Sequence, residues 1–369
     1  MASTRSLLVL MLFLLPRLQT VKSGFFVQMF QRSRSITSPV VIPKDGVYLV
    51  SIIIDPCVGC YGKVKLFCQR QGIDRFLFTT YSDDIYSNAE VAVGLYKNDK
   101  LSLRKIYNIG AWSSFSVIYV AELDGFYFTV RNDLASKSSP LAYTSRLWPV
   151  GWGTLYKTLN IPITGIYWVT VRVRPFVDPT VTVDLRAGST ILFVVYVEER
   201  KTVSASGAFH LGAGSSIKAT TRQRHSYDVH CLLSVVYLAG NKKPNTYPFQ
   251  HLAFTGRYYR KCGTGNQALL KFDLVKTNHG YMYRDGYTEI RRTGTYMISI
   301  RLDPESKPTI TVSLYVNGKS YWVVNAERSV PTGATISVFL QAVSYLEVRC
   351  TYATTIGPGN MFSVAFIQP

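Results

Sequence analysis

The sequence predicts an all-β protein made of three tandem sandwich units, and three observations support this class. One strand-like phrase occurs three times in the 369 residues. Tyr, Phe, Val, Ile and Thr dominate the apolar segments, and no stretch shows the 3.6-residue period of an amphipathic helix. A chain of this length exceeds what one core usually organises, so several domains are expected.

The repeated phrase is the first element of the argument. It reads GVYLVSIIIDP from Gly46, GIYWVTVRVRP from Gly165 and GTYMISIRLDP from Gly294. The second and third copies alternate with period two, which predicts half-buried strands, whereas the three isoleucines of the first copy predict burial on both faces. The glycine marks a turn into each strand, and the proline ends it because proline has no N–H to donate.

Further strands follow each copy in the same order. A second alternating strand ends at a glycine turn, and a later apolar strand closes the unit. The second strands read VKLFCQRQG from Val64, VTVDLRAG from Val181 and ITVSLYVNG from Ile310, and the closing strands read FSVIYVA from Phe115, LSVVYLA from Leu233 and FSVAFIQ from Phe362. The repeated order predicts one sandwich per copy of the phrase.

The spacing of the copies gives the predicted domain boundaries. The phrase recurs after 119 and then 129 residues, counting from one opening glycine to the next. We predict units at 24–124, 125–243 and 244–369. Only 22 residues separate Gly24 from Gly46, against 40 from Gly125 to Gly165. The first unit is therefore predicted to be shortened at its N-terminus and to lack its opening strand or hairpin.

Residues 1–23 have the pattern of a secretory signal peptide. Arg5 supplies a positive start, Leu7 to Leu15 is a short apolar segment, and small residues precede Gly24. The apolar segment is too short to span a bilayer. We therefore expect a secreted, extracellular protein.

The third unit carries residues that resemble the globular head of the complement C1q family, within the tumour-necrosis-factor-like jelly-roll superfamily. The matching positions are Phe272, Val275, Asn278, Tyr283, Gly294, Tyr296, Asn317, Gly318, Phe362 and Ser363. The resemblance covers 248–369 well, 126–240 moderately and only the later part of the first unit. The glycine that the family places after Phe-Ser is Val117, Val235 and Val364 here.

The resemblance implies jelly-roll sandwiches that trimerise through one apolar face. Three tandem heads joined by short linkers are expected to pack as a pseudo-trimer within one chain. The alternatives are separate heads along the chain, or self-association in which heads of different chains form the trimers. Some family members bind calcium at the trimer apex. The equivalent positions here are Asp55, Arg174 and Asp303, and one arginine in this ring predicts no calcium there.

The six cysteines are Cys57, Cys60, Cys68, Cys231, Cys262 and Cys350. An even number in a secreted chain predicts disulfides, although six cysteines allow fifteen complete pairings. Cys262 with Cys350 is the preferred pair because both lie in the last unit. Cys57 and Cys60 bracket a Val-Gly turn and are expected to form a local disulfide rather than a redox or zinc site. Cys68 and Cys231 remain, either joined between units or as thiols.

No catalytic motif or cofactor site stands out in the sequence. The five histidines form no His-Glu-x-x-His pattern, and Gly-x-Ser-x-Gly does not occur. Ser215 to Lys218 matches Ser-x-x-Lys without the companion motifs of the enzymes that use it. We therefore expect a non-enzymatic protein with no cofactor and no metal.

The net charge of +19 favours anionic partners: glycans, lipids or acidic protein faces. Basic residues exceed acidic ones by 11 − 9 = 2 in 24–124, 14 − 6 = 8 in 125–243 and 13 − 7 = 6 in 244–369. A secreted protein makes nucleic acid a poor candidate. The candidate ligand-binding residues are Arg172 and Arg174, then Arg222 and Arg224, then Arg257, Tyr258, Tyr259, Arg260 and Lys261.

The predicted function is that of a secreted, lectin-like recognition protein that binds anionic or glycan surfaces or a protein partner, as in innate immunity. Two alternatives remain. One is a tumour-necrosis-factor-like signalling ligand for a cell-surface receptor, and the other is a structural component of the extracellular matrix.

Overall fold

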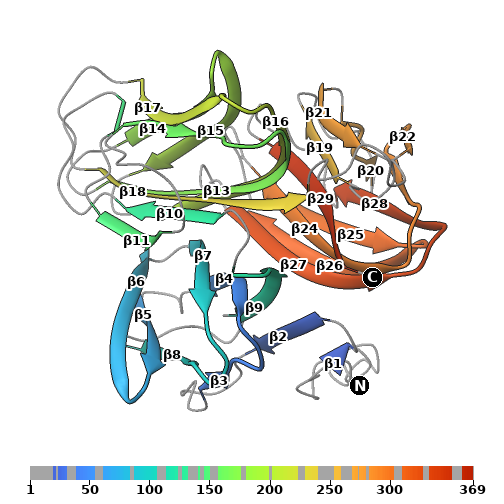
Figure 1. Ribbon diagram of the computed structural model, residues 1–369. Coiled ribbons are helices and arrows are strands. Elements are labelled where there is room, and N and C mark those ends of the chain that lie inside the picture. Colours follow the sequence, from blue (N-terminus) through green and yellow to red (C-terminus); the bar gives the residue numbers. More distant parts are fainter. Residues whose placement is uncertain are drawn as a thin grey trace, which may run out of the picture.

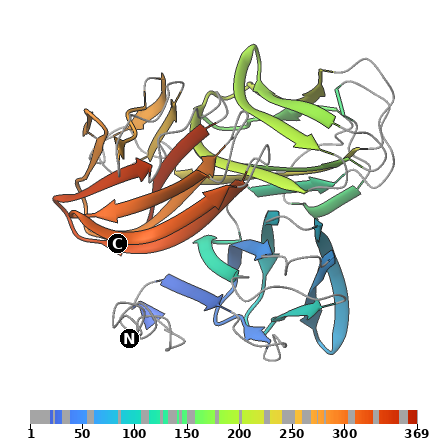
Figure 2. The ribbon, with the colours of Figure 1, turned by 180° about the vertical axis from the view of Figure 1, so that it is seen from behind.

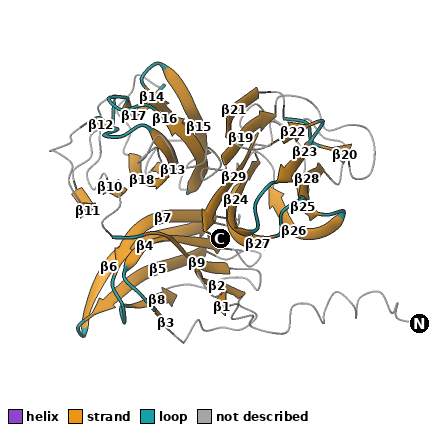
Figure 3. Cartoon of the chain, turned by 45° about the vertical axis from the view of Figure 1, so that its right-hand side comes forward, coloured by secondary structure: helices purple, strands orange, loops and turns teal. Residues whose placement is uncertain are grey.

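A computed structural model gives the architecture of the chain. It describes residues 20–21, 24–30, 39–54, 61–83, 87–105, 114–123, 127–131, 140–141, 145–149, 157–175, 180–198, 202–222, 229–239, 253–258, 268–272, 274–279, 282–302, 310–326, 332–350 and 360–368. These residues form six sheets in three pairs, and every strand pairing is antiparallel (Figure 1). The secondary structure is strand and turn throughout the described part of the chain, as Figure 3 shows, so the prediction of an all-β fold is confirmed.

Three five-stranded sheets contain the repeated phrase, and we call them the inner sheets. Their strand orders are β1 (Thr20–Val21), β2 (Gly24–Phe30), β9 (Ser114–Ala121), β4 (Gly46–Ile54) and β7 (Ser87–Leu95); β11 (Ser145–Pro149), β10 (Tyr127–Arg131), β18 (Val229–Ala239), β13 (Gly165–Pro175) and β16 (Val203–Leu211); and β21 (Leu274–His279), β19 (Ala253–Tyr258), β29 (Asn360–Gln368), β24 (Gly294–Leu302) and β27 (Thr332–Leu340).

The other three sheets, which we call the outer sheets, each pack on one inner sheet. Their strand orders are β3 (Val40–Val41), β8 (Lys100–Lys105), β5 (Tyr61–Arg70) and β6 (Ile73–Asp83); β12 (Leu159–Asn160), β17 (Ser216–Thr221), β14 (Thr180–Ala187) and β15 (Thr190–Glu198); and β22 (Met282–Arg284), β23 (Tyr287–Ile290), β28 (Ser344–Cys350), β25 (Ile310–Val316) and β26 (Lys319–Ala326), with β20 (Ala268–Leu269) beside β28.

Apart from the edge strands β1, β11 and β21 and the additional β20 and β22, the strand order is the same in all three pairs of sheets. The chain passes between inner and outer sheet in each pair and makes one hairpin within the outer sheet, which is the connection pattern of a jelly roll. Strand β2 pairs with β9 as β10 pairs with β18 and β19 with β29. The first unit was expected to lack its opening strand or hairpin. The segment before Gly46 does supply an opening strand, β2, but among the described residues no partner strand follows β2 as β11 follows β10 and β21 follows β19. Strand β1 lies within the predicted signal peptide and pairs with β2.

The tyrosine of the repeated phrase closes the turn that leads into each inner strand. Its hydroxyl donates a hydrogen bond to a carbonyl four residues earlier: Tyr48 to Lys44 at 2.8 Å, Tyr167 to Ile163 at 2.6 Å and Tyr296 to Arg292 at 2.6 Å. Burial raises the pKa of Tyr167 to about 12, so this hydroxyl keeps its proton at physiological pH. The Gly-x-Tyr spacing, which occurs in all three copies of the phrase, is thus associated with a closed turn as well as with a strand.

The strands of the repeated phrase are buried on both faces in all three units. Every residue of β24 is buried, including Ser299 and Arg301 on the polar side of the alternation. The period-two pattern had predicted one exposed face for the second and third copies, and this prediction is wrong. One side of each inner sheet covers its own sandwich core, and the other side is covered by the neighbouring units.

The three units close into a ring around one shared apolar cluster. Its buried members come from inner strands of all three units: Val47, Leu49, Ala92, Ile118, Val120, Ile166, Trp168, Ala208, Val236, Ala253, Met297 and Ala365. The edge strands β7, β16 and β27 contact one another pairwise. Figures 1 and 2 show the three units side by side, each touching the other two. Within the chain, the three pairs of sheets therefore pack against one another around this cluster, as the hypothesis of a pseudo-trimer requires.

The contacts around this ring run in one direction. One side chain of each unit packs into or against the core of the next unit. Leu232 and Met361 occupy equivalent positions, opposite Arg172 and Arg301, whereas Ile53 occupies the position equivalent to those two arginines. Leu232 of the second unit belongs to the core of the first, Met361 of the third to that of the second, and Ile53 of the first packs against that of the third. Head-to-tail contacts of this kind close into a ring when the rotation suits three members.

The cysteines within the described residues are all buried. Cys68, Cys231 and Cys350 lie in the cores of the first, second and third unit, and no disulfide joins any of these three to another. A bond between Cys68 and Cys231, one of the two possibilities left by the sequence, is therefore excluded. Cys57, Cys60 and Cys262 lie outside the described residues, so their predicted pairings stay predictions.

Within the described part of the chain, no helix is long and apolar enough to cross a membrane.

Candidate functional site

The interior of the ring holds a polar layer centred on Glu90. This side chain from β7 is 1% exposed. Its Oε1 accepts hydrogen bonds from Trp168 Nε1 at 3.1 Å and Thr170 Oγ1 at 3.0 Å, both from the second unit. The hydroxyls of Ser206 and Thr335, at the equivalent positions of the other two units, bond to the same carboxyl group.

Burial raises the pKa of Glu90 above its usual value, and the four hydrogen bonds oppose that shift only in part. The layer therefore joins the three units through one carboxyl group. Ser51, Thr170, Ser299 and the hydroxyls around Glu90 are buried too. Among the described residues, exposed charged side chains lie on the outer sheets instead.

A second set of polar contacts lies two residues earlier on the same edge strands. The amide of Asn88 in β7 donates to the carbonyl of Gly333, and the backbone N–H of Ser204 donates to Asn88 Oδ1 at 3.0 Å. These residues occupy equivalent places in β7, β16 and β27. A side chain at Gly333 would meet the Ser204 carbonyl at 2.9 Å, so the close approach of the three strands requires glycine there.

The predicted pair Arg172 and Arg174 lies in β13, on the ring side of the second unit. Arg172 is 8% exposed, and its strand neighbours are Ser204 and Leu232. Arg174 is half-buried, two residues further along the strand. Arg301 is the equivalent of Arg172 in the third unit, and its Nη1 donates to the carbonyl of Val194 at 2.5 Å. The arginines of this layer lie between units rather than on an open surface.

Arg222 lies on the outer sheet of the second unit, where it is exposed. Its Nε donates to Asp184 Oδ1 at 2.9 Å, and Arg186 Nη2 bonds the other oxygen of that carboxylate at 3.2 Å. The Asp184 side chain is only 4% exposed, against 53% for Arg222 and 33% for Arg186. Lys218 pairs with Arg186 across β17 and β14. The outward side of this sheet therefore presents cations around one sunken carboxylate.

The sequence analysis missed Asp184, Arg186 and Lys218. The alternation in VTVDLRAG places Asp184 and Arg186 on one face of β14, and this signal was available. The partner strand β17 became known only from the sheet register. Arg224 lies outside the described residues, so its predicted role beside Arg222 stays a prediction.

The third predicted cluster lies mostly outside the described residues. Arg257 and Tyr258 belong to β19 and pair with Met361 and Asn360 of β29. Tyr259, Arg260 and Lys261 follow, and they are not among the residues that the structure describes. The role of this cluster in binding stays a prediction.

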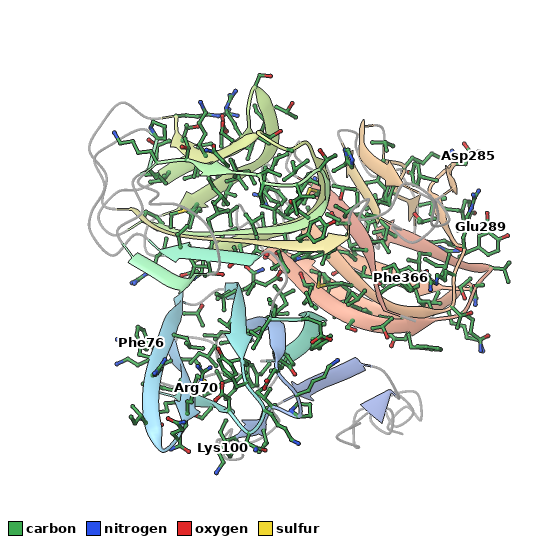
Figure 4. The ribbon with its side chains drawn as sticks, in the orientation of Figure 1. Arg70, Phe76, Lys100, Asp285, Glu289 and Phe366 are labelled. Carbon is green, nitrogen blue, oxygen red and sulfur yellow. The ribbon has the colours of Figure 1, made fainter. Side chains whose placement is uncertain are left out.

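The outer sheet of the first unit carries an aromatic pair beside an ion pair. The rings of Phe67 and Phe76 meet edge-on with centroids 5.8 Å apart. The guanidinium of Arg104 lies 4.2 Å from the Phe67 centroid and is paired with the Asp74 carboxylate. Figure 4 shows Phe76 at the outer side of this unit, away from the ring contacts. The balanced charges here match the low net charge counted for the first unit.

Among the described residues, no group of three His, Cys, Asp or Glu side chains comes together to hold a metal. Asp55 and Asp303 of the possible apical calcium ring lie outside the described residues. The prediction that no calcium binds there is therefore not tested.

Comparisons with known proteins give weak matches to structures alone. No protein-family model matches the chain, and no curated protein matches it. The globular domain of zebrafish complement 1qA protein is 11% identical with a TM-score of 0.27, over 31% of this chain and 98% of its own. A triple jelly roll from an archaeal virus turret is 8% identical with a TM-score of 0.20, over 93% and 81%.

The paired carbohydrate-binding modules CBM22-1 and CBM22-2 of Paenibacillus barcinonensis Xyn10C are 13% identical with a TM-score of 0.20, over 57% of this chain and 81% of theirs. Likenesses at this level identify no family. The assignment of jelly-roll architecture therefore rests on the strand order within this chain.

Proposed function

We propose that the chain is a secreted, non-enzymatic recognition protein whose three C1q-like jelly rolls bind anionic glycan surfaces through their outer sheets. The observation that carries the proposal is the cationic face of the second unit, where Arg186 and Arg222 bond the buried Asp184 and Lys218 lies opposite Arg186 on the neighbouring strand. The other anionic partners, lipids and acidic proteins, would meet the same face.

The geometry of this face suits an anionic partner. Asp184 fixes the two arginines in place, yet its own charge lies beneath them, so a sulfate or carboxylate group would meet guanidinium groups first. Arginine donors in a fixed arrangement favour planar oxyanions. The surrounding unit has an excess of eight basic residues, which would draw a polyanion toward it.

The closed ring supports a binding role because it leaves the outer sheets uncovered. The inner sheets bury their second faces against neighbouring units, and the faces that remain point away from the axis in three directions. A single chain of this kind would present three different surfaces in fixed positions, so contact with a repetitive surface could use more than one of them.

Heparin chromatography of the purified chain tests the proposal. The double variant Lys218→Gln with Arg222→Gln should elute at lower salt than the parent protein, since fewer counterions are released on binding. Arg104→Gln is the matched control, because it also removes an exposed arginine that is paired with an aspartate on an outer sheet. Equal elution of the double variant and the parent would contradict the proposal.

Further measurements test whether the chain is secreted and separate the proposal from its alternatives. N-terminal sequencing of protein recovered from the culture medium should begin at Gly24 if residues 1–23 are removed on secretion. Binding to cells that is saturable and insensitive to salt would instead favour a receptor ligand, and insoluble cross-linked material would favour a matrix component.

A further inference from the structure

The outward face of the third unit's outer sheet differs from the cationic face of the second. Strands β23, β28, β25 and β26 lie side by side, and alternation turns Tyr287, Tyr345, Tyr315 and Tyr321 away from the core. Their inward neighbours Ile290, Leu346, Val348, Val312 and Leu314 are buried. We call these four tyrosines, with Glu347 and Arg349, the tyrosine face.

Four large hydrophobic side chains are exposed on this sheet, while others, such as Ile73 and Phe339, lie elsewhere in the described residues. Tyr287 is 41% exposed, Tyr345 47% and Tyr321 55%, and the adjacent outward Val323 is 49% exposed. The described part of the second unit has no exposed large hydrophobic side chain. An isolated exposed aromatic residue needs no explanation, but several on neighbouring strands mark a binding surface.

The sheet geometry spreads the aromatic rings around one carboxylate. Tyr287 and Tyr315 lie directly opposite Glu347 on its two neighbouring strands, so about 10 Å, two strand spacings, separates them. Tyr345 lies on the same strand as Glu347, two residues earlier. Tyr321 is the extra residue of a β-bulge, because Leu314 pairs with Trp322 while Tyr315 pairs with Ser320. Bulges of this kind redirect a side chain.

Glu347 and Arg349 form an oriented polar pair within these rings. Arg349 donates to Glu347 Oε2 from Nε at 2.7 Å and from Nη2 at 2.5 Å, and its guanidinium lies 4.5 Å from the centroid of the Tyr315 ring. The Glu347 side chain is 8% exposed and that of Arg349 28%. Both bonds from Arg349 go to Oε2, so Oε1 takes no part in this ion pair.

We propose that the tyrosine face binds neutral carbohydrate, with sugar rings stacked on the tyrosines and hydroxyl groups bonded to Glu347 and Arg349. Tyrosine combines a flat apolar ring with a polar hydroxyl, which suits a ligand with apolar ring faces and a rim of hydroxyls. A fixed acceptor beside a fixed donor suits a hydroxyl group, which needs both.

The charge of the tyrosine face favours a neutral ligand, whereas the proposed function assigns an anionic ligand to the cationic face of the second unit. At the described sheet positions its outward ionisable groups are Glu289, Glu347 and Arg349, and Arg284 of β22 pairs with Tyr287, so two carboxylates are matched by two guanidinium groups. With its charges balanced, this face would attract a polyanion less than the second unit does, with its excess of eight basic residues. Figure 4 shows Glu289 at the outer edge of the third unit, far from the other two units, so the face is open to a polymer.

Affinity gel electrophoresis of the purified chain with soluble neutral polysaccharides, a β-glucan and a mannan, tests the proposal. Mobility should fall in at least one gel. Tyr287→Ala and Tyr345→Ala should each weaken the retardation about tenfold, the size expected for losing one stacked aromatic ring. Tyr345→Phe should retain most of it, since the ring remains. Tyr96→Ala is the matched control, because Tyr96 is 46% exposed but lies in the first unit.

The outcomes separate this site from the cationic face. Loss of polysaccharide binding in the tyrosine variants with unchanged elution from heparin would support the proposal and leave the proposed function standing. Absence of retardation of the parent chain in both gels, or equal loss in Tyr96→Ala, would overturn it. A dimer in sedimentation that dissociates in Tyr345→Ala would also overturn it, since the face would then be an interface between two copies.

Discussion

The carboxyl group of Glu90 offers a direct test of how the ring is held together. Burial raises its pKa, whereas the unfolded chain leaves it near 4.5. Below pH 4.5 the group is protonated in both states and its contribution to stability is complete. As the pH rises through the raised pKa, the folded protein must either hold the proton or bury a charge, so this contribution is lost.

Glu90→Gln removes that titration while preserving the shape of the side chain. Its amide oxygen can accept from Trp168 and Thr170, as Oε1 does now, and its NH₂ can donate to the hydroxyls of Ser206 and Thr335, which rotate freely enough to accept. Relative to the variant, the parent should lose up to about 1.4 kcal/mol per pH unit between pH 4.5 and the pKa of Glu90 in the folded protein.

Thermal unfolding of both proteins between pH 5 and pH 9 measures this difference. The midpoint of Glu90→Gln should exceed that of the parent at pH 8, and the gap should shrink toward pH 5. Glu90→Ala is the contrast, because it leaves Trp168 Nε1 without its acceptor and should destabilise at every pH, by about 1–3 kcal/mol for each donor left unsatisfied. A gap between parent and Glu90→Gln that does not vary with pH would refute the reasoning.

Three further predictions concern the fold. Leu232→Ala should lower the free energy of unfolding by about 2–5 kcal/mol, as should Met361→Ala by a similar mechanism, because each leaves a cavity in the core of the next unit; denaturant titration measures both. Gly46→Ala should prevent normal folding of the first unit, judged by circular dichroism, since a methyl group there overlaps the ring of Tyr119. Burial raises the pKa of the Cys68 thiol to about 11, so this thiol should not react with a chromogenic disulfide at pH 8 until the protein unfolds, and mass spectrometry of the labelled chain would show an early reaction.

The repeat of the strand phrase was enough to predict the all-β fold class. Tyr48 has a local role, since its hydroxyl bonds the Lys44 carbonyl and closes the turn, and such a role can be recognised from the neighbouring residues. The exposure of the second and third phrases could not be predicted in the same way. Ser299 and Arg301 sit at positions that face water in an isolated sandwich, and only the ring covers them.

The candidate sites show the same division. Arg222 was found from its place in a basic cluster, but Asp184, which holds it, lies on a strand far away in sequence. The tyrosine face is still less visible, since Tyr287, Tyr315 and Tyr345 come from three strands separated by up to 58 residues, 345 − 287. The register of the strands in the sheet brings such residues together, and this register cannot be predicted from the composition along the chain.

The polar layer around Glu90 is asymmetric, because the three equivalent positions carry different residues. A trimer of identical chains could not have this arrangement. In a trimer of identical chains, a glutamate at the position of Glu90 would bring three carboxyl groups together at the axis, and like charges at that distance oppose one another's ionisation. Here the equivalent places hold Ser206 and Thr335, which donate to the single carboxyl group. The residues two positions earlier on these strands are also different from one another: a single Asn88 bonds both Ser204 and Gly333. Joining the three units in one chain lets each take a different part in a contact that symmetry would otherwise forbid, and it leaves each outer sheet able to carry a different binding face.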